Sequence, residues 1–210
     1  MDDARGVAGL VLAAGAGHRF GEPKALVRDS ASELTWVERA VCRVAAADVD
    51  RLLVVVGAEA DSVCEVLLSG AWAVGRQSRR RVEVHLVDAP DWAEGMGASL
   101  RAGLAAAREV VPDVDGLLVT LVDLPDVDER VHRRVVSSAR GARTAALVRA
   151  AYAGVPGHPV VIGRDHWTGV GRTAHGDRGA RDYFAAHPPH LVECGDLATG
   201  RDVDRPTDQA

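Results

Sequence analysis

The chain has 210 residues, of which 47% are hydrophobic and 26% are charged. This length and composition predict one large domain, spanning residues 1–210, with a substantial hydrophobic core. The formal net charge of −5 argues against a general nucleic-acid binder, because such a protein needs an excess of positive charge. The sequence holds no apolar run near the roughly 20 residues that cross a bilayer, so we expect no membrane segment.

The cysteines and the N-terminus indicate the cellular compartment. Cys42, Cys64 and Cys194 are an odd number without close pairing, which indicates reduced thiols rather than a disulfide framework. The residues after Met1 are acidic and lack the basic and apolar regions of a signal peptide. We therefore expect a cytoplasmic protein, in which Cys42 and Cys64 are core thiols within helical segments.

Strand-like and helix-like segments alternate along the chain. The hydrophobic pattern predicts, in chain order, a strand at 9–14, a helix at 33–47, a strand at 51–56, a helix at 61–69, a strand at 82–87, a helix at 98–110, a strand at 116–122, a helix at 128–139, strands at 144–149 and 158–162, a helix at 178–187 and a strand at 191–194. A turn is expected at 154–157. This alternation predicts the α/β class, with a mostly parallel sheet covered by helices on both faces.

The first predicted strand runs directly into a glycine-rich loop. The loop holds three glycines, Gly15, Gly17 and Gly21, which let the backbone approach a polyphosphate. Arg19 and Lys24 add positive charge to the same loop. The loop does not fit the P-loop pattern G-x-x-x-x-G-K-[ST], and Phe20 stands where the dinucleotide fingerprint G-x-G-x-x-G needs a glycine. The loop therefore predicts a site for a nucleoside triphosphate, bound in another way.

Asp123 follows the predicted strand at 116–122, just as the glycine loop follows the first strand. In parallel sheets, ligands bind beyond the carboxyl ends of the strands, where the strand order reverses. We expect the Asp123 carboxylate and the Lys24 ammonium to meet there at one nucleotide. The alternative is that Asp123 is only a cap or turn residue before Pro125. The polar tail at 201–210 is expected to fray, unless residues 202–204 fold back onto the domain.

The pattern L-A-A-G-x-G-x-R-x-G-x-P-K at residues 12–24 resembles the signature of nucleotidyltransferases that join a nucleoside monophosphate to a phosphorylated acceptor. Five further segments resemble the molybdenum cofactor cytidylyltransferase branch, close to the MobA-like NTP transferases: residues 95–101, 122–125, 157–160, 176–181 and 202–206. The resemblance implies a Rossmann-like nucleotidyltransferase fold. The chain departs from the family pattern at residues 29–32, which replace a short glycine turn, and at Arg205, where a small polar residue is more common.

The resemblance implies transfer of CMP from CTP to the phosphate of a molybdopterin-type cofactor, with Mg²⁺ and with release of pyrophosphate. A molybdoenzyme would then receive the product. The expected catalytic residues are Arg19, Lys24 and Asp123, since two anions must be brought together and the leaving group neutralised. Asp123 is the expected metal ligand. Asp204 is either a second ligand, as in related sugar nucleotidyltransferases, or a simple turn carboxylate.

The expected nucleotide- and acceptor-binding residues are Leu12, Ala13, Ala14, Gly15, Gly17, Arg19, Lys24, Gly97, Ser99, His158, Asp177 and Arg181. The Ala-Ala pair before the glycine loop favours cytidine. Ser99 either touches the nucleoside or caps a helix. His158 belongs to an acceptor-side motif. Asp177 and Arg181 either grip the pterin together with Arg178, or form an i, i+4 surface pair.

Two alternatives remain open from the sequence. One is a related NTP transferase that uses GTP or UTP with a sugar phosphate or a small phospho-acid. The other is a non-catalytic molybdenum cofactor carrier or insertion chaperone. The presence of Arg19, Lys24 and Asp123 together speaks against a pure carrier, which has no need of a metal-binding carboxylate opposite a triphosphate loop.

Overall fold

Seven strands form one sheet in the computed structural model, which describes residues 6–18, 20–29, 32–70 and 81–204. The strands are β1 (Val7–Leu12), β2 (Arg51–Val56), β3 (Glu83–Asp88), β4 (Gly116–Leu121), β5 (Leu147–Tyr152), β6 (Val155–Gly163) and β7 (His190–Glu193). Their spatial order is β3-β2-β1-β4-β6-β5-β7. Strand β6 runs antiparallel to β4 and β5, and the other described neighbours are parallel. The predicted class, α/β with a mostly parallel sheet, is confirmed.

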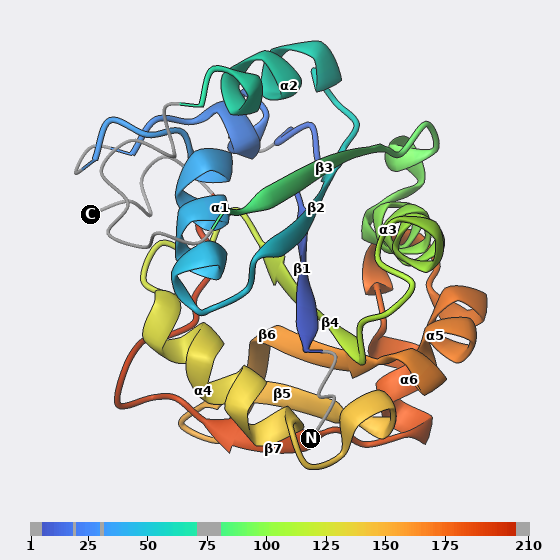
Figure 1. Ribbon diagram of the computed structural model, residues 1–210. Helices are drawn as coiled ribbons and strands as arrows, with labels where there is room; N and C mark the ends of the chain where they lie inside the picture. Colours follow the sequence, from blue (N-terminus) through green and yellow to red (C-terminus); the bar gives the residue numbers. More distant parts are fainter. Residues whose placement is uncertain (1–5, 19, 30–31, 71–80, 205–210) are drawn as a thin grey trace.

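Helices cover both faces of this sheet (Figure 1). They are α1 (Trp36–Ala46), α2 (Ala60–Leu68), α3 (Met96–Val110), α4 (Glu129–Ala139), α5 (Trp167–Thr173) and α6 (Arg181–Ala186). Short 3₁₀ turns are η1 (Lys24–Leu26), η3 (Trp92–Glu94), η4 (Arg143–Ala145), η5 (Arg164–His166) and η6 (Gly176–Arg178). Helices α1, α2 and α4 lie on one side of the sheet, and α3, α5 and α6 lie on the other.

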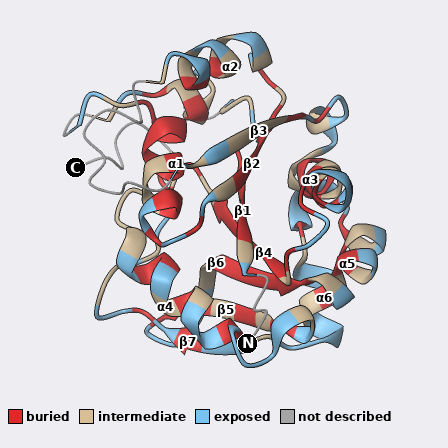
Figure 2. Ribbon diagram, viewed as in Figure 1, coloured by how far each residue is buried: buried red, intermediate tan, exposed pale blue. Residues whose placement is uncertain are grey.

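Each face of the sheet has its own hydrophobic core. Successive side chains of a strand point to opposite faces, so β1 sends Val11 to the core under α1 and α4 and Leu10 to the core under α3. Both side chains are fully buried. Figure 2 shows that the central strands are buried along most of their length. Burial on both faces explains why β1 and β2 appear in the sequence as continuous apolar runs rather than as alternating patterns.

Helix α1 begins at Trp36, three residues after the predicted start at 33. Thr35 is the N-cap, and its side chain and that of Glu38 form a reciprocal capping box. Glu33 has a positive φ of 58° and cannot belong to the helix. The apolar repeat alone predicted too early a start because Leu34 continues the pattern into the loop.

The hairpin between β5 and β6 differs most from the prediction. Strand β5 extends to Tyr152, and Ala153 and Gly154 form the turn with positive φ values of 51° and 78°. This two-residue turn suits the twist of a hairpin, so the residues expected to turn at 155–157 belong to β6 instead. Residues 143–145, where a strand was expected to begin, form the 3₁₀ turn η4.

Helix α5 was not predicted, because its sequence W-T-G-V-G-R-T contains two glycines and two threonines. Tertiary packing holds it in place. Trp167 is 1% exposed and its indole N–H donates to the Ile162 carbonyl at 2.9 Å. A Cβ at Gly169 would lie 2.4 Å from the Tyr183 ring, so this glycine lets α5 and α6 approach closely.

The three cysteines differ in how far they are buried. Cys42 and Cys64 lie in α1 and α2 as expected, but both are only partly buried, so their interpretation as core thiols is wrong. Each packs against the edge of the core, while Cys194 after β7 is fully buried.

Across the described ranges, none of the helices has both the length and the hydrophobicity that crossing a bilayer requires.

Candidate functional site

The sheet brings the ends of β1 and β4 side by side. These strands are parallel neighbours, and Leu12 pairs with Leu121 in the register. From β1 the chain passes to β2 and β3 on one side, and then returns to β4 on the other side of β1. The strand order therefore reverses between β1 and β4, and this is where ligands bind in such sheets. The glycine loop and the loop that carries Asp123 leave the sheet at the same level.

Lys24 and Asp123 meet at this edge. Lys24 opens η1, and its Nζ donates to Asp123 Oδ2 and to Asp204 Oδ1, at 2.8 Å each. The side chains of Lys24 and Asp123 are 16% and 14% exposed, whereas that of Asp204 is 46% exposed. The sequence places these residues far apart, and the structure gathers them around one ammonium group.

The surroundings shift the pKa values of both Asp123 and Lys24. Burial raises the pKa of the Asp123 carboxyl above its usual range, and the nearby Lys24 ammonium offsets only part of this effect. Burial also acts to lower the pKa of Lys24, but hydrogen bonds and charge from Asp123 and Asp204 outweigh it and raise that pKa. Lys24 is therefore charged at neutral pH, and a further positive charge near Asp123 would favour its carboxylate form.

Three carboxylates at this edge fit a divalent cation. Oxygens of Asp123, Asp202 and Asp204 all lie within 4.8 Å of one another. Asp123 Oδ1 is buried and has no hydrogen-bond partner among the described residues, so it has capacity for a ligand. Carboxylate oxygens suit a hard ion such as Mg²⁺ or Mn²⁺. Asp202 was not among the predicted metal ligands, although its place in the closing D-x-D pattern was the signal that could have found it.

The glycine loop is tightly folded. Gly17 has a φ of +62°, and a Cβ there would lie 1.9 Å from the Glu22 carbonyl oxygen. Its own carbonyl accepts from the N–H groups of Phe20 and Gly21 at 2.7 and 2.9 Å. Gly15, in contrast, is exposed, and a Cβ there would meet no atom within 4 Å. Gly15 thus borders open space. The predicted catalytic Arg19 lies outside the described residues.

Leu12, Ala13 and Ala14 are buried where β1 joins the loop. The Ala13 N–H donates to Val55 at 2.9 Å, and the Ala14 carbonyl accepts from the Ala58 N–H at 3.0 Å. These two groups are therefore used to fix the loop to the end of β2 rather than being presented to a ligand. The three residues lie at the predicted place, at the base of the glycine loop.

The start of α3 lies against the segment before η6. A Cβ at Gly97 would lie 2.7 Å from the His175 backbone nitrogen, so this glycine allows close backbone packing. Ser99 is buried at 6% exposure within the helix, and Gly95 is the N-cap. The alternative that Ser99 caps the helix is therefore wrong. Its predicted contact with a nucleoside stays a prediction.

The predicted acceptor-side residues lie on β6, η6 and α6. His158 is partly buried and joins Pro159 through a cis peptide bond, and burial, together with the charge of Arg149, lowers its pKa to about 4. Asp177 and Arg181 are exposed. In this described segment the i, i+4 ion pair joins Arg178 to Asp182, one position beyond the predicted pair.

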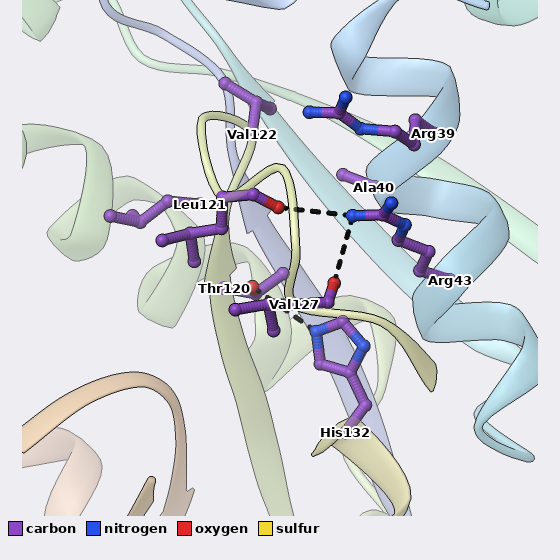
Figure 3. A pocket seen from close by; sticks show the side chains of 9 residues that line it. Arg39, Ala40, Arg43, Thr120, Leu121, Val122, Val127 and His132 are labelled. Atoms are coloured by element: carbon purple, nitrogen blue, oxygen red, sulfur yellow. Dashed lines mark hydrogen bonds between the residues drawn. The ribbon is translucent and has the colours of Figure 1, made fainter. Parts of the chain in front are cut away.

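A small cavity lies behind the loop that carries Asp123, between α1, β4 and α4 (Figure 3). Arg43 donates to the carbonyls of Leu124 and Val127 at 3.2 and 3.1 Å and thereby holds this loop. Thr120 and His132 face one another at 3.4 Å in its wall. The cavity has room for about one water molecule, so it is too small for a nucleotide.

A switch-point glycine loop opposite a cluster of acidic residues defines the chain as a nucleotide-binding α/β protein of the nucleotidyltransferase type. The chain belongs to the MobA-like NTP transferase family, whose domain model matches residues 9–191. This match confirms the family that the sequence motifs predicted. Membership implies an NTP substrate and supports a nucleotidyltransferase activity.

The chain is similar to a curated protein and to several solved structures. A curated relative, nicotine blue oxidoreductase of Paenarthrobacter nicotinovorans, is 34% identical over 209 residues, which covers 94% of this chain and 92% of that protein. A solved nucleotidyl transferase from Methanothermobacter thermautotrophicus shares the fold, with a TM-score of 0.75, 23% identity and coverage of 96% and 93% of the two chains. The manganese complex of Rv0371c from Mycobacterium tuberculosis H37Rv is 25% identical, with a TM-score of 0.68 and coverage of 97% and 95%.

Proposed function

We propose that this protein transfers a nucleoside monophosphate from a nucleoside triphosphate to a phosphorylated acceptor. The observation that carries the proposal is the meeting of Lys24, Asp123 and Asp204 at the switch point of the sheet, beside the glycine loop. A cationic side chain and a set of carboxylates are what a triphosphate and its divalent ion require together. Family membership supports the same activity.

In this reaction an acceptor phosphate oxygen attacks the α-phosphorus. A new bond forms between them, the bond from the α-phosphorus to the bridging oxygen breaks, and pyrophosphate leaves. Asp123, Asp202 and Asp204 would hold a divalent ion, which supplies charge neutralisation for the triphosphate when bound. Lys24 and Arg19 would hold the phosphates and stabilise the leaving pyrophosphate. The attacking oxygen is already an anion, so the protein needs no strong base.

At a finer level we propose CTP as the nucleotide, Mg²⁺ as the ion and a molybdopterin-type cofactor as the acceptor, in the cytoplasm. The Ala13-Ala14 pair supports cytidine, and the segments at 157–160 and 176–181 support the acceptor. In this proposal Gly15, Gly97 and Ser99 contact the nucleotide. His158, Asp177 and Arg181 contact the acceptor, and a molybdoenzyme takes the product.

The test identifies the nucleotide first and the acceptor second. The melting temperature is first measured with each of the four NTPs and Mg²⁺, because a ligand that binds the native state raises it. Pyrophosphate release is then measured with the preferred NTP and molybdenum cofactor, or with a sugar phosphate or phospho-acid. Release with CTP and molybdenum cofactor supports the full proposal. Tight cofactor binding without release from any NTP would instead indicate a carrier.

A redox activity is the second candidate, and the 34% identity to nicotine blue oxidoreductase over nearly the whole chain favours it. The glycine loop lacks the G-x-G-x-x-G dinucleotide fingerprint, so in this case the pyrophosphate of a nicotinamide dinucleotide would be bound in another way. The measurement is the oxidation of NADH or NADPH in the presence of nicotine blue, followed by absorbance. Turnover there, with no pyrophosphate release from any NTP, would replace the transferase proposal.

A further inference from the structure

Two of the three clustered carboxylates come from a segment without helix or strand. We call residues 194–204 the C-terminal strap; it follows β7 and carries Asp202 and Asp204. Fixing such a segment costs conformational entropy at every residue, so its order must come from specific contacts. The strap has these contacts at several points along its length.

The strap is attached at its beginning and at its end. At its beginning, the Cys194 N–H donates to the Ala151 carbonyl of β5 at 2.7 Å, and Arg134 of α4 pairs with Asp196. Near the other end, Val203 is 3% exposed and its N–H donates to the Asp123 carbonyl at 3.0 Å. The strap therefore binds the backbone of the residue whose carboxylate joins the cluster.

Between these ends, Asp126 holds the middle of the strap. Its Oδ2 accepts from the N–H of Thr199 at 2.5 Å and from the Thr199 hydroxyl at 2.6 Å. Asp126 stands in the same loop as Asp123, only three positions further on. Thr199 and Asp204 are five positions apart, a stretch of chain that spans at most about 18 Å when extended. Anchoring Thr199 thus limits how far Asp204 can move from Asp123.

We propose that Asp126 and Thr199 are positioning residues that hold Asp202 and Asp204 against Asp123 and so complete the cation site. The loop after β4 supplies both a carboxylate for the ion and the anchor for the segment that brings the other two. The link to metal binding rests on the proposed function. The docking of the strap does not, because it concerns contacts within the chain alone.

One variant weakens the anchor, one removes it and one keeps part of it. Thr199→Val removes the hydrogen bond from the hydroxyl to Asp126 and the longer one, at 3.4 Å, that the hydroxyl accepts from the Arg201 N–H, whereas Asp126→Ala removes both bonds to Thr199. Asp126→Asn keeps a carbonyl oxygen that can accept from Thr199, and its new NH₂ group takes the place of Oδ1, which has no partner among the described residues. Thr144→Val is the matched control, because Thr144 also donates to an aspartate, Asp165, at 3.1 Å but lies at η4.

The experiment has two readouts on the full chain. Hydrogen exchange of the Val203 amide reports docking of the strap, and electron paramagnetic resonance of free Mn²⁺ reports cation affinity. We expect Thr199→Val to speed Val203 exchange and weaken Mn²⁺ binding about tenfold, since one hydrogen bond to a charged group is worth about that factor, and Asp126→Ala to have the larger effect because it removes two such bonds. Asp126→Asn keeps an acceptor without its charge, so its effects should be smaller than those of Asp126→Ala, and Thr144→Val should behave like the parent protein.

The outcomes separate this inference from the proposed function. Val203 exchange and Mn²⁺ affinity that are unchanged in Asp126→Ala would overturn the positioning role. Faster Val203 exchange with unchanged Mn²⁺ affinity would also overturn it, because the strap would then be dispensable for the cation. A parent protein that protects Val203 but binds no Mn²⁺ would refute the proposed metal site, while faster exchange in the variants would still support the anchoring of the strap.

Discussion

The ammonium of Lys24 lies 2.8 Å from the Asp123 carboxylate, although the two residues are 99 positions apart in the chain. The same ammonium lies 2.8 Å from Asp204. One lysine thus contacts two of the three carboxylates that we propose to bind a divalent ion. Lys24 and that ion therefore compete for the negative charge of the same carboxylates, whereas the phosphates of a bound nucleotide would draw Lys24 away from them.

Replacing Lys24 should separate its competition with the divalent ion from its binding of the nucleotide phosphates. In Lys24→Met we expect Mn²⁺ to bind severalfold more tightly in the absence of nucleotide, because no internal cation holds the carboxylates. The NTP affinity should fall by about tenfold or more, because a charge-assisted contact to phosphate is lost. Both affinities can be measured by calorimetry. Weaker Mn²⁺ binding in Lys24→Met would show that the lysine shapes the site rather than competing with the ion.

Asp123→Asn should abolish transfer while leaving the fold intact. Loss of a carboxylate that binds the ion removes several kcal/mol of electrostatic stabilisation, so pyrophosphate release should fall at least about a hundredfold. Burial disfavours the charged form of Asp123, which is why its pKa is raised, so the neutral amide should not lower the melting temperature. Asp113→Asn, at the exposed pair with Arg51, is the control. Full activity in Asp123→Asn would remove the proposed metal site.

Two glycines of one loop should respond differently to alanine. Gly17→Ala places a methyl group against the Glu22 carbonyl in a left-handed backbone, which should cost about 1–3 kcal/mol of stability. Gly15→Ala meets open space, so stability should be unchanged while NTP affinity falls, because the methyl group would occupy the path of the phosphates. Thermal unfolding and nucleotide titration measure the two quantities. Unchanged NTP affinity in Gly15→Ala would place the nucleotide elsewhere.

His132 should make the fold sensitive to acid. It is 2% exposed, and burial together with the charge of Arg43 lowers its pKa from 6.5 to about 4. Between these values the unfolded chain binds more protons than the folded one, so the free energy of unfolding falls as the pH drops through this window. The loss amounts to roughly 3 kcal/mol.

His132→Gln should remove this part of the acid sensitivity. Urea unfolding at pH 7.5 and pH 4.5 gives the change in stability for each protein, and the parent should lose roughly 2–3 kcal/mol more than the variant, since pH 4.5 still lies above the folded pKa of about 4. His190→Gln is the control, because His190 is exposed on β7. Equal losses in the parent and in His132→Gln would show that the buried imidazole does not carry the effect.

Sequence patterns predicted β2 and β4 almost to the residue because these strands are buried on both faces and appear as short apolar runs, whereas β1, predicted at 9–14, begins and ends two residues earlier. Helix α4 was predicted within one residue, and Asp128, expected as its first residue, is its N-cap. The patterns failed where packing decides the structure. Helix α5 has low intrinsic propensity and is held in place because its first residue, Trp167, is buried in the core, and the β5–β6 turn depends on positive φ values at Ala153 and Gly154.

The sequence by itself determined the class of the fold, the glycine loop and the carboxylate that follows β4. Each of these depends on residues close together in the chain, where hydrophobic periodicity and local backbone preferences act. The strand pattern already predicted that Lys24 and Asp123 meet, but only the tertiary structure decided that Asp204 shares this lysine and that Asp202 joins the cluster. Those contacts depend on strand order and on the docking of the C-terminal strap, which arise from pairing between distant segments that no local pattern specifies.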